Sequence, residues 1–88
     1  MKVQFRDSFS QDLTKIKNEA MLKRIKRAIE SVEKAQDFQT IPNLKKLRGG
    51  HTYYRIKVGE YRIGLSIENN LWTFIRCLDR KDIYRYFP

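Results

Sequence analysis

The sequence is short of the residue types that build disulfides, metal centres and membrane spans. Among its 88 residues there is one cysteine, Cys77, and one histidine, His51. A lone cysteine excludes an intrachain disulfide and a multi-cysteine metal site, and it is typical of a reducing compartment. No run approaches the ~20 apolar residues of a membrane span, and MKVQFRDSFS lacks the apolar stretch of a signal peptide. We therefore expect a cytoplasmic protein with no membrane association, no metal and no cofactor.

Acidic residues are also scarce. The chain has 10 Asp and Glu residues and 19 Lys and Arg residues, which gives a formal net charge of +9. Such an excess suits a polyanionic partner, either a nucleic acid or an acidic protein. With 41% hydrophobic residues the chain can still bury one core, and its length predicts a single domain over residues 1–88.

The N-terminal half predicts one short strand followed by two helices. Val3 and Phe5 alternate with polar residues, as in a strand, and Ser8 with Gln11 forms a capping-box pattern that opens a first helix. A second helix over 19–35 has aliphatic residues at the three-and-four spacing of a buried stripe. Its other face is basic, and we interpret it as a solvated surface: Lys23, Arg24, Lys26, Arg27 and Lys34.

The C-terminal half predicts three consecutive strands. Residues 36–52 break the periodicity with Pro42 and the Gly49-Gly50 pair, so we expect a connecting loop there. The period then changes to two, and Gly59-Glu60 and Asn69-Asn70 suit two-residue hairpin turns. The strands are expected over 53–58, 61–68 and 71–78. We therefore predict an α+β fold, a small antiparallel sheet of about four strands with both helices packed on one face and the other face open.

The register of the first hairpin places cations together on the uncovered face. A turn at Gly59-Glu60 sets Lys57 opposite Arg62 and Arg55 opposite Gly64. Directly opposed like charges destabilise a sheet by a few tenths to about 1 kcal/mol per pair. One interpretation is that these long side chains splay into screened solvent. The other is that a bound phosphate relieves the repulsion, with Gly64 leaving room for close approach.

The same register assigns the buried face. On the third strand, a two-residue turn at Asn69-Asn70 places Trp72 and Phe74 on this face, and also Arg76 at the end of the sheet. The core-side pairs of the first hairpin are Val58 with Tyr61, Ile56 with Ile63 and Tyr54 with Leu65.

The order of these motifs resembles that of a known family. The stretch LKKLRGGHTYYRIKVGEYRIGLSI, followed by an apolar strand and RKDIYRYF, is similar to the RelE/ParE superfamily of toxins from type II toxin–antitoxin systems. The resemblance covers essentially the whole chain. It implies a ribosome-dependent mRNA endonuclease of the RelE type, which acts on mRNA in the ribosomal A site and is neutralised by a partner antitoxin. It also implies the catalytic residues, which match Arg55, Lys57, Arg62, Arg80 and Tyr84 here.

The chemistry of RNA cleavage suggests a role for each of these residues. Attack by the 2′-hydroxyl needs a base, stabilisation of negative charge on phosphorus and a proton for the departing 5′-oxygen, and no metal in principle. Lys57 is the predicted base, because neighbouring cations destabilise an ammonium group; a fixed phosphate-binding cation is the rival interpretation. Arg62 and Arg80 suit a phosphate clamp because a guanidinium presents a planar fork of donors. Tyr84 is expected to stack on a base or to orient the hydroxyl.

Other residues are expected to position RNA or to hold the tail. Tyr86 and Phe87 are predicted to pack the tail against the sheet, and His51 stays outside the catalytic set. Several relatives carry His where this chain has Asp79, whose carboxylate can pair with Arg80, act as a base or indicate reduced activity. The remaining cations are predicted to bind phosphates of messenger or ribosomal RNA: Lys45, Lys46, Arg48, Lys81 and Arg85.

Two other functions remain open. A ParE-like toxin with this fold poisons DNA gyrase without cutting RNA, but such toxins generally lack cations at the matching places. A non-catalytic RNA-binding module stacks bases on aromatic residues of its central strands, and here only Tyr53 is a clear candidate. The cations of the first hairpin therefore favour the RelE-type interpretation.

Overall fold

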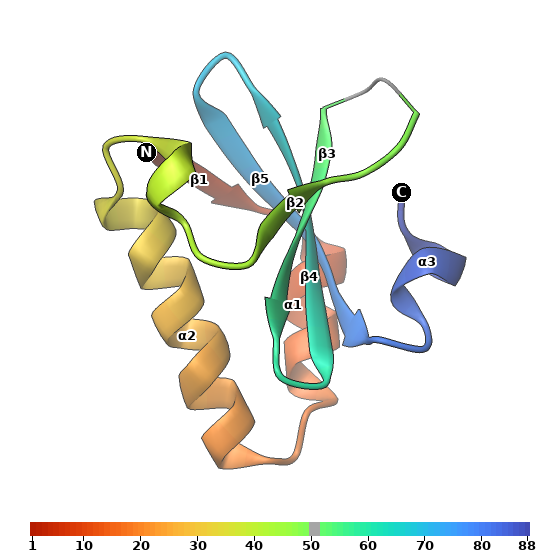
Figure 1. Cartoon of the computed structure of the whole chain (residues 1–88). Helices are drawn as coiled ribbons and strands as arrows, with labels where there is room; N and C mark the ends of the chain where they lie inside the picture. Colours follow the sequence, from red (N-terminus) through yellow and green to blue (C-terminus); the bar gives the residue numbers. More distant parts are fainter. Residues whose placement is uncertain (50–51) are drawn as a thin grey trace.

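The computed structural model describes residues 1–49 and 52–88 and has the predicted α+β class (Figure 1). His51, which we left outside the catalytic set, falls outside the described residues. The second helix and the three hairpin strands are confirmed to within one residue at each end. The elements in chain order are β1 (Lys2–Phe5), α1 (Asp7–Thr14), α2 (Glu19–Lys34), the 3-10 helix η1 (Phe38–Thr40), β2 (Leu44–Lys46), β3 (Tyr53–Val58), β4 (Tyr61–Glu68), β5 (Leu71–Asp79) and α3 (Ile83–Tyr86).

The strands form one five-stranded sheet in the order β1-β5-β4-β3-β2. The four strands from β2 to β5 pair antiparallel, but β1 runs parallel to β5. The prediction of an antiparallel sheet of about four strands is therefore wrong on the strand count and on β1. The alternation within a strand shows which residues share a face, but it does not identify the neighbouring strand. At the β1–β5 junction, Gln4 Nε2 donates to Thr73 Oγ1 at 2.8 Å.

The stretch predicted as a connecting loop contains regular structure. After η1, β2 joins the sheet as an edge strand, with Leu44 opposite Ile56 and Lys45 opposite Arg55. Asn43, just before β2, has a positive φ of 64°, which an Asn tolerates better than most residues. The prediction of a plain loop over 36–52 is wrong, because a strand of three residues is too short to reveal an alternation.

The helices begin at different signals. At the start of α1, Ser8 Oγ donates to the Ile75 carbonyl at 2.6 Å instead of capping its own helix, so the predicted capping box is wrong. At the start of α2, the side chain of Asn18 accepts a hydrogen bond from the Met21 N–H at 3.1 Å. No helix in the described part of the chain combines the length and apolarity needed to cross a bilayer.

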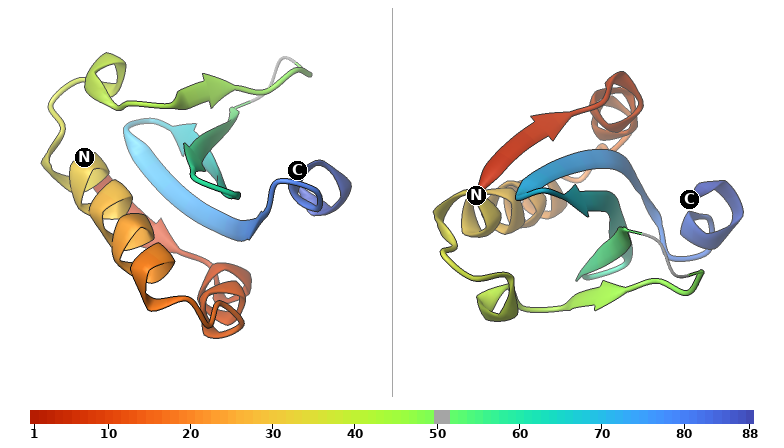
Figure 2. Two further views of the ribbon diagram at one scale, coloured as in Figure 1. Left: turned by 60° about the horizontal axis from the view of Figure 1, so that its bottom comes forward. Right: turned by 90° about the horizontal axis from the view of Figure 1, so that it is seen from above.

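The core lies between the sheet and the first two helices. The left view of Figure 2 places α1 and α2 on one side of the sheet and α3 on the other. The β3–β4 register matches the prediction pair by pair, and Trp72 and Phe74 are fully buried as expected. Each buried aliphatic or aromatic side chain stabilises the fold by roughly 1.5–3 kcal/mol. The buried cluster consists of Phe9, Ile16, Ile25, Val32, Ile41, Ile56, Val58, Ile63, Leu65, Trp72, Phe74 and Cys77.

A bulge in the β4–β5 ladder changes the position of Arg76. The register shifts between Gly64 and Leu65, so Arg76 pairs with Gly64, and the prediction that it shares the core side with Phe74 is wrong. Its guanidinium instead donates two hydrogen bonds to the buried carboxylate of Asp12 on α1, at 2.8 and 3.1 Å. These hydrogen bonds raise the pKa of Arg76 above its ordinary value.

Candidate nucleic-acid interface

The sheet face away from α1 and α2 carries the predicted catalytic cations of the hairpin. Lys57 pairs with Arg62 and Arg55 pairs with Gly64, as the sequence predicts. Lys45 on the neighbouring strand β2 extends the charge, because pairing partners in a ladder point to the same face of the sheet, whereas the charge of Arg76 on β5 is balanced by Asp12. Read strand by strand from β2 to β5, the row through Arg55 consists of Lys45, Arg55, Gly64 and Arg76.

The centre of this face is covered by the chain's own C-terminal tail. Phe87 is 3% exposed, and its ring meets the ring of Tyr53 edge to face with the centroids 5.4 Å apart. A Cβ added to Gly64 would lie 2.7 Å from the Phe87 ring, so only a glycine permits this contact. Phe87 therefore packs as predicted, but the expectation that Gly64 leaves room for a ligand is wrong. Tyr86 is 55% exposed and contacts the sheet at its margin, where the guanidinium carbon of Arg76 on β5 lies 5.9 Å from the centroid of its ring.

Three of the predicted catalytic residues lie at the β3–β4 turn, and we call Lys57, Arg62 and Arg80 the hairpin-end cluster. Arg62 Nη1 donates to the Gly59 carbonyl at 2.8 Å. Arg80 Nε lies 3.0 Å from Glu60 Oε2, and the Arg80 N–H donates to the Glu60 carbonyl at 2.8 Å. Lys57 is exposed and pairs with Arg62. Backbone carbonyls and one carboxylate thus offset part of the repulsion before any ligand binds.

Arg55 is held at the edge of the sheet, beside the backbone of Lys57. Its Nη1 donates to the carbonyl of Asn43 at 2.9 Å, and the same carbonyl accepts the Lys57 N–H at 3.3 Å. The Arg55 Nε atom is buried and has no hydrogen-bond partner among the described residues. Asn43 therefore directs the Arg55 guanidinium toward the edge of the sheet, level with Lys57.

Asp79 does not pair with Arg80. Its Oδ1 accepts the N–H of Lys81 at 2.9 Å, and its partner across the ladder is Tyr61, which the prediction placed on the core side. The ion-pair partner of Arg80 is Glu60, with both side chains more than half exposed. Of the three interpretations of Asp79, the one in which its carboxylate holds Arg80 is wrong.

Tyr84 lies with the basic edge of the sheet, apart from the hairpin end. It is 62% exposed on α3. Together with part of β2 it lines a depression of about 370 Å³, which we call the tyrosine depression. Three cations predicted to bind RNA thus gather beside Tyr84. The residues that line the depression are Lys45, Lys46, Leu47, Arg48, Tyr84, Phe87 and Pro88.

The two other cations predicted to bind RNA are exposed and lie outside the tyrosine depression. Arg85 has its guanidinium carbon 6.0 Å from the centroid of the Tyr86 ring. Lys81 is exposed directly after Arg80. Among the described residues, no group of three His, Cys, Asp or Glu side chains is arranged as metal ligands.

Arg24 on α2 is a cation near the hairpin end that the sequence pattern did not single out. A Cβ added to Gly59 would lie 2.8 Å from Arg24 Nη1, so the guanidinium rests against the β3–β4 turn. Gly59 has a φ of 57°, a conformation that also favours glycine. The sequence shows only a basic helix face, and the contact depends on how α2 crosses the sheet.

Comparisons with known proteins agree with this fold. Residues 3–84 match the family described as ParE toxin of type II toxin–antitoxin system, parDE. Toxin RelE3 of Methanocaldococcus jannaschii is 42% identical over the full length of both chains.

Solved structures of toxins resemble the whole chain. The RelB–RelE antitoxin–toxin complex from Methanococcus jannaschii includes a chain with 39% identity and a TM-score of 0.80, covering 96% of this chain and 98% of that one. A chain of the archaeal RelE–RelB complex from Pyrococcus horikoshii has a TM-score of 0.73 at 17% identity, covering 93% and 97%, and shows the shared fold. The protein therefore belongs to the ParE toxin family of type II toxin–antitoxin systems, and within it to the RelE-like toxins.

Proposed function

We propose that the protein is a ribosome-dependent mRNA endonuclease and that the hairpin-end cluster is its catalytic centre. The observation that carries this proposal is the pairing of Lys57 with Arg62 on the face away from the helices, with Arg80 at the same turn. These three cations come from two consecutive strands and from the segment that directly follows β5. An RNA phosphate bound between them would be stabilised by three positive charges.

The proposed reaction uses the substrate's own nucleophile. Lys57 removes the proton of the 2′-hydroxyl, the 2′-oxygen attacks phosphorus, and the bond from phosphorus to the 5′-oxygen breaks. Arg62 and the terminal nitrogens of Arg80 stabilise the negative charge that builds up on the phosphoryl oxygens. The departing 5′-oxygen takes a proton from water, so the products carry a 2′,3′-cyclic phosphate and a 5′-hydroxyl.

The tyrosine depression provides a place for the rest of the RNA. The exposed ring of Tyr84 offers a stacking surface for one base, which is worth roughly 1–3 kcal/mol. Lys45, Lys46 and Arg48 beside it bind backbone phosphates, and Arg55 lies between the depression and the cluster along β3. We assign Lys81 and Arg85 to outer contacts with ribosomal RNA.

A protein partner follows from the same assignment. The solved relatives from Methanococcus jannaschii and Pyrococcus horikoshii are described as RelB–RelE complexes. We propose that a cognate antitoxin binds this chain and neutralises it, and that both act in the cytoplasm, where translating ribosomes are found. The excess of positive charge suits a partner whose binding segment is acidic.

Primer extension on mRNA in translating ribosomes tests the proposed activity. Purified protein is expected to produce cuts at the A-site codon, and Lys57→Ala and Arg62→Ala are each expected to slow cleavage by roughly 100-fold or more. The circular dichroism spectra of both variants should match that of the wild type, because both side chains are outside the core. Intact mRNA together with trapped gyrase–DNA complexes would replace this proposal with the ParE-like activity.

A further inference from the structure

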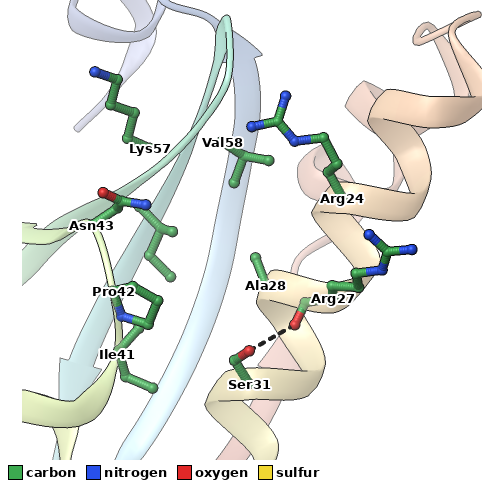
Figure 3. Close-up of a pocket in the computed structure, with 10 residues that line it drawn as sticks. Arg24, Arg27, Ala28, Ser31, Ile41, Pro42, Asn43, Lys57 and Val58 are labelled. Atoms are coloured by element: carbon green, nitrogen blue, oxygen red, sulfur yellow. Dashed lines mark hydrogen bonds between the residues drawn. The ribbon is translucent and has the colours of Figure 1, made fainter.

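A groove of about 260 Å³ separates α2 from the edge of β3 (Figure 3). Its floor is aliphatic: Ala28 comes from α2, Ile41 from the segment before β2, and Ile56 and Val58 from β3. The three residues outside the helix are 2–7% exposed, so they already form part of the core and present a fixed surface. No aromatic side chain is among the residues that line the groove.

Cations line the rim of this groove. Arg24 reaches from α2 toward Val58, and Arg27, one turn further along the helix, also lines the groove, with its guanidinium drawn across α2 (Figure 3). No carboxylate of residues 1–49 or 52–88 forms an ion pair with either guanidinium. The charges of Arg24 and Arg27 are therefore not balanced by a carboxylate of the described residues. Arg76 differs, because its guanidinium is paired with Asp12.

We propose that this groove docks an acidic, amphipathic segment of the protein that neutralises the toxin, with its apolar side chains on the floor and its carboxylates at Arg24 and Arg27. The proposal rests on the proposed function for the identity of that partner. Burial of each aliphatic side chain contributes roughly 1.5–3 kcal/mol, and the charges select an acidic segment over a basic one.

The lining favours a protein segment over RNA. Single-stranded RNA is held by cations together with rings on which its bases stack, and the groove supplies the cations without the rings. An aliphatic floor instead matches Leu, Ile or Val side chains spaced along one face of a helix or strand.

The position of the groove connects docking to the catalytic face. Lys57 lies at its lip, and its ammonium group points away from α2 in Figure 3. Lys57 also pairs with Arg62 in the hairpin-end cluster. A segment seated in the groove therefore ends beside the proposed catalytic cations, where one further carboxylate would compete with an RNA phosphate.

Binding of a synthetic 16-residue helical peptide, with Leu on one face and Glu on the other, tests the docking site by fluorescence anisotropy. The double variant Arg24→Glu, Arg27→Glu is expected to weaken binding about tenfold or more, equivalent to about 1.4 kcal/mol. The matched control Lys23→Glu, Lys26→Glu makes the same change in net charge on the same helix, away from the residues that line the groove, and is expected to stay within about twofold of wild type. Ser31→Trp, which fills the groove without changing charge, is expected to weaken binding about tenfold as well.

Three results would overturn the docking proposal. Equal weakening by both charge reversals would show a general charge effect, and equal binding of a peptide with Ser in place of Leu would show that the floor is unused. Displacement of the peptide by a single-stranded RNA oligonucleotide, lost in the Arg24→Glu, Arg27→Glu variant, would assign the groove to RNA. The assay contains no ribosome, so its failure is distinguishable from failure of the nuclease proposal, which is judged by A-site cleavage.

Discussion

The two faces of the sheet are built from alternating residues of the same strands but differ in almost every physical respect. On the face beneath α1 and α2, aliphatic and aromatic side chains exclude water, and Ile63 has no exposed surface. On the other face, its neighbour Arg62 reaches a backbone carbonyl and remains partly exposed. The covered face supplies the stability that allows the other face to hold like charges close together.

The C-terminal tail adds a second contrast, within the sheet face away from α1 and α2, which we call the far face. Phe87 covers the centre of this face, and Ile83 is buried at the start of α3. The hairpin-end cluster and the tyrosine depression, on either side of Phe87, stay accessible. Gly64 makes this arrangement possible, since any side chain there would strike the Phe87 ring. The tail thus divides the far face into two basic areas, and Phe87 fixes where Tyr84 lies.

The largest predicted effect on stability comes from the covered face. Ile63→Ala removes a completely buried side chain and is expected to reduce the free energy of unfolding by roughly 2–5 kcal/mol, measured by urea denaturation. Cleavage per folded molecule is expected to stay near that of the wild type. A loss below about 1 kcal/mol would contradict the assignment of this face as the core.

The next largest effect is expected one residue further along β4. Gly64→Ala forces the Phe87 ring to move and is expected to reduce the free energy of unfolding by roughly 1–3 kcal/mol. In the background Phe87→Ala, the same substitution is expected to have little effect, because the clash is gone. Equal losses of stability in both backgrounds would show that the effect of Gly64→Ala does not come from a clash with the Phe87 ring.

Cys77 allows the covered face to be tested through pH. Burial raises the pKa of its thiol to about 12 from an ordinary value of 9.0. Between these two values the unfolded chain loses the thiol proton while the folded protein keeps it, so stability falls as pH rises, by up to about 1.4 kcal/mol per pH unit. The difference in unfolding free energy between wild type and Cys77→Ala, measured from pH 8 to pH 11, is expected to narrow above about pH 9. A constant difference would indicate that the thiol is accessible to water.

The smallest effect is expected at the exposed end of the hairpin. Glu60→Gln removes the ion pair with Arg80, in which both side chains are more than half exposed, and is expected to change stability by less than about 1 kcal/mol. Thermal unfolding measured at low and high salt checks this, and the wild type and the variant are expected to converge at high salt. A loss of several kcal/mol in the free energy of unfolding would contradict the description of the Glu60–Arg80 ion pair as a solvent-exposed contact.

The parts of the fold that the sequence predicts are those with a strong local period. The stripe of α2 and the alternation of β3 and β4 are enough to predict which residues pair and which are buried, from Val58 and Tyr61 to Tyr54 and Leu65. The partner of β1 and the three-residue strand β2 depend on contacts distant in sequence, so local patterns do not reveal them. The bulge that moves Arg76 to the row of Gly64 is likewise a property of two strands together.

The features of the candidate site also divide into those that local sequence patterns predict and those that depend on contacts between distant parts of the chain. Pairing alone is enough to predict that Lys57 and Arg62 lie side by side, and the resemblance to RelE toxins adds Arg80. The cover that Phe87 places over Gly64, and the approach of Arg24 to Gly59, result from packing between elements distant in the chain. Those two contacts decide which parts of the far face a ligand can reach.

The most direct test of the account is a charge-matched comparison of A-site cleavage by Arg62→Ala and Lys26→Ala. Both variants lose one positive charge, the first from the hairpin-end cluster and the second from the exposed outer surface of α2. The account predicts that Arg62→Ala slows cleavage by roughly 100-fold or more while Lys26→Ala stays within about twofold of the wild type. Equal losses in the two variants, or full activity in both, would contradict it.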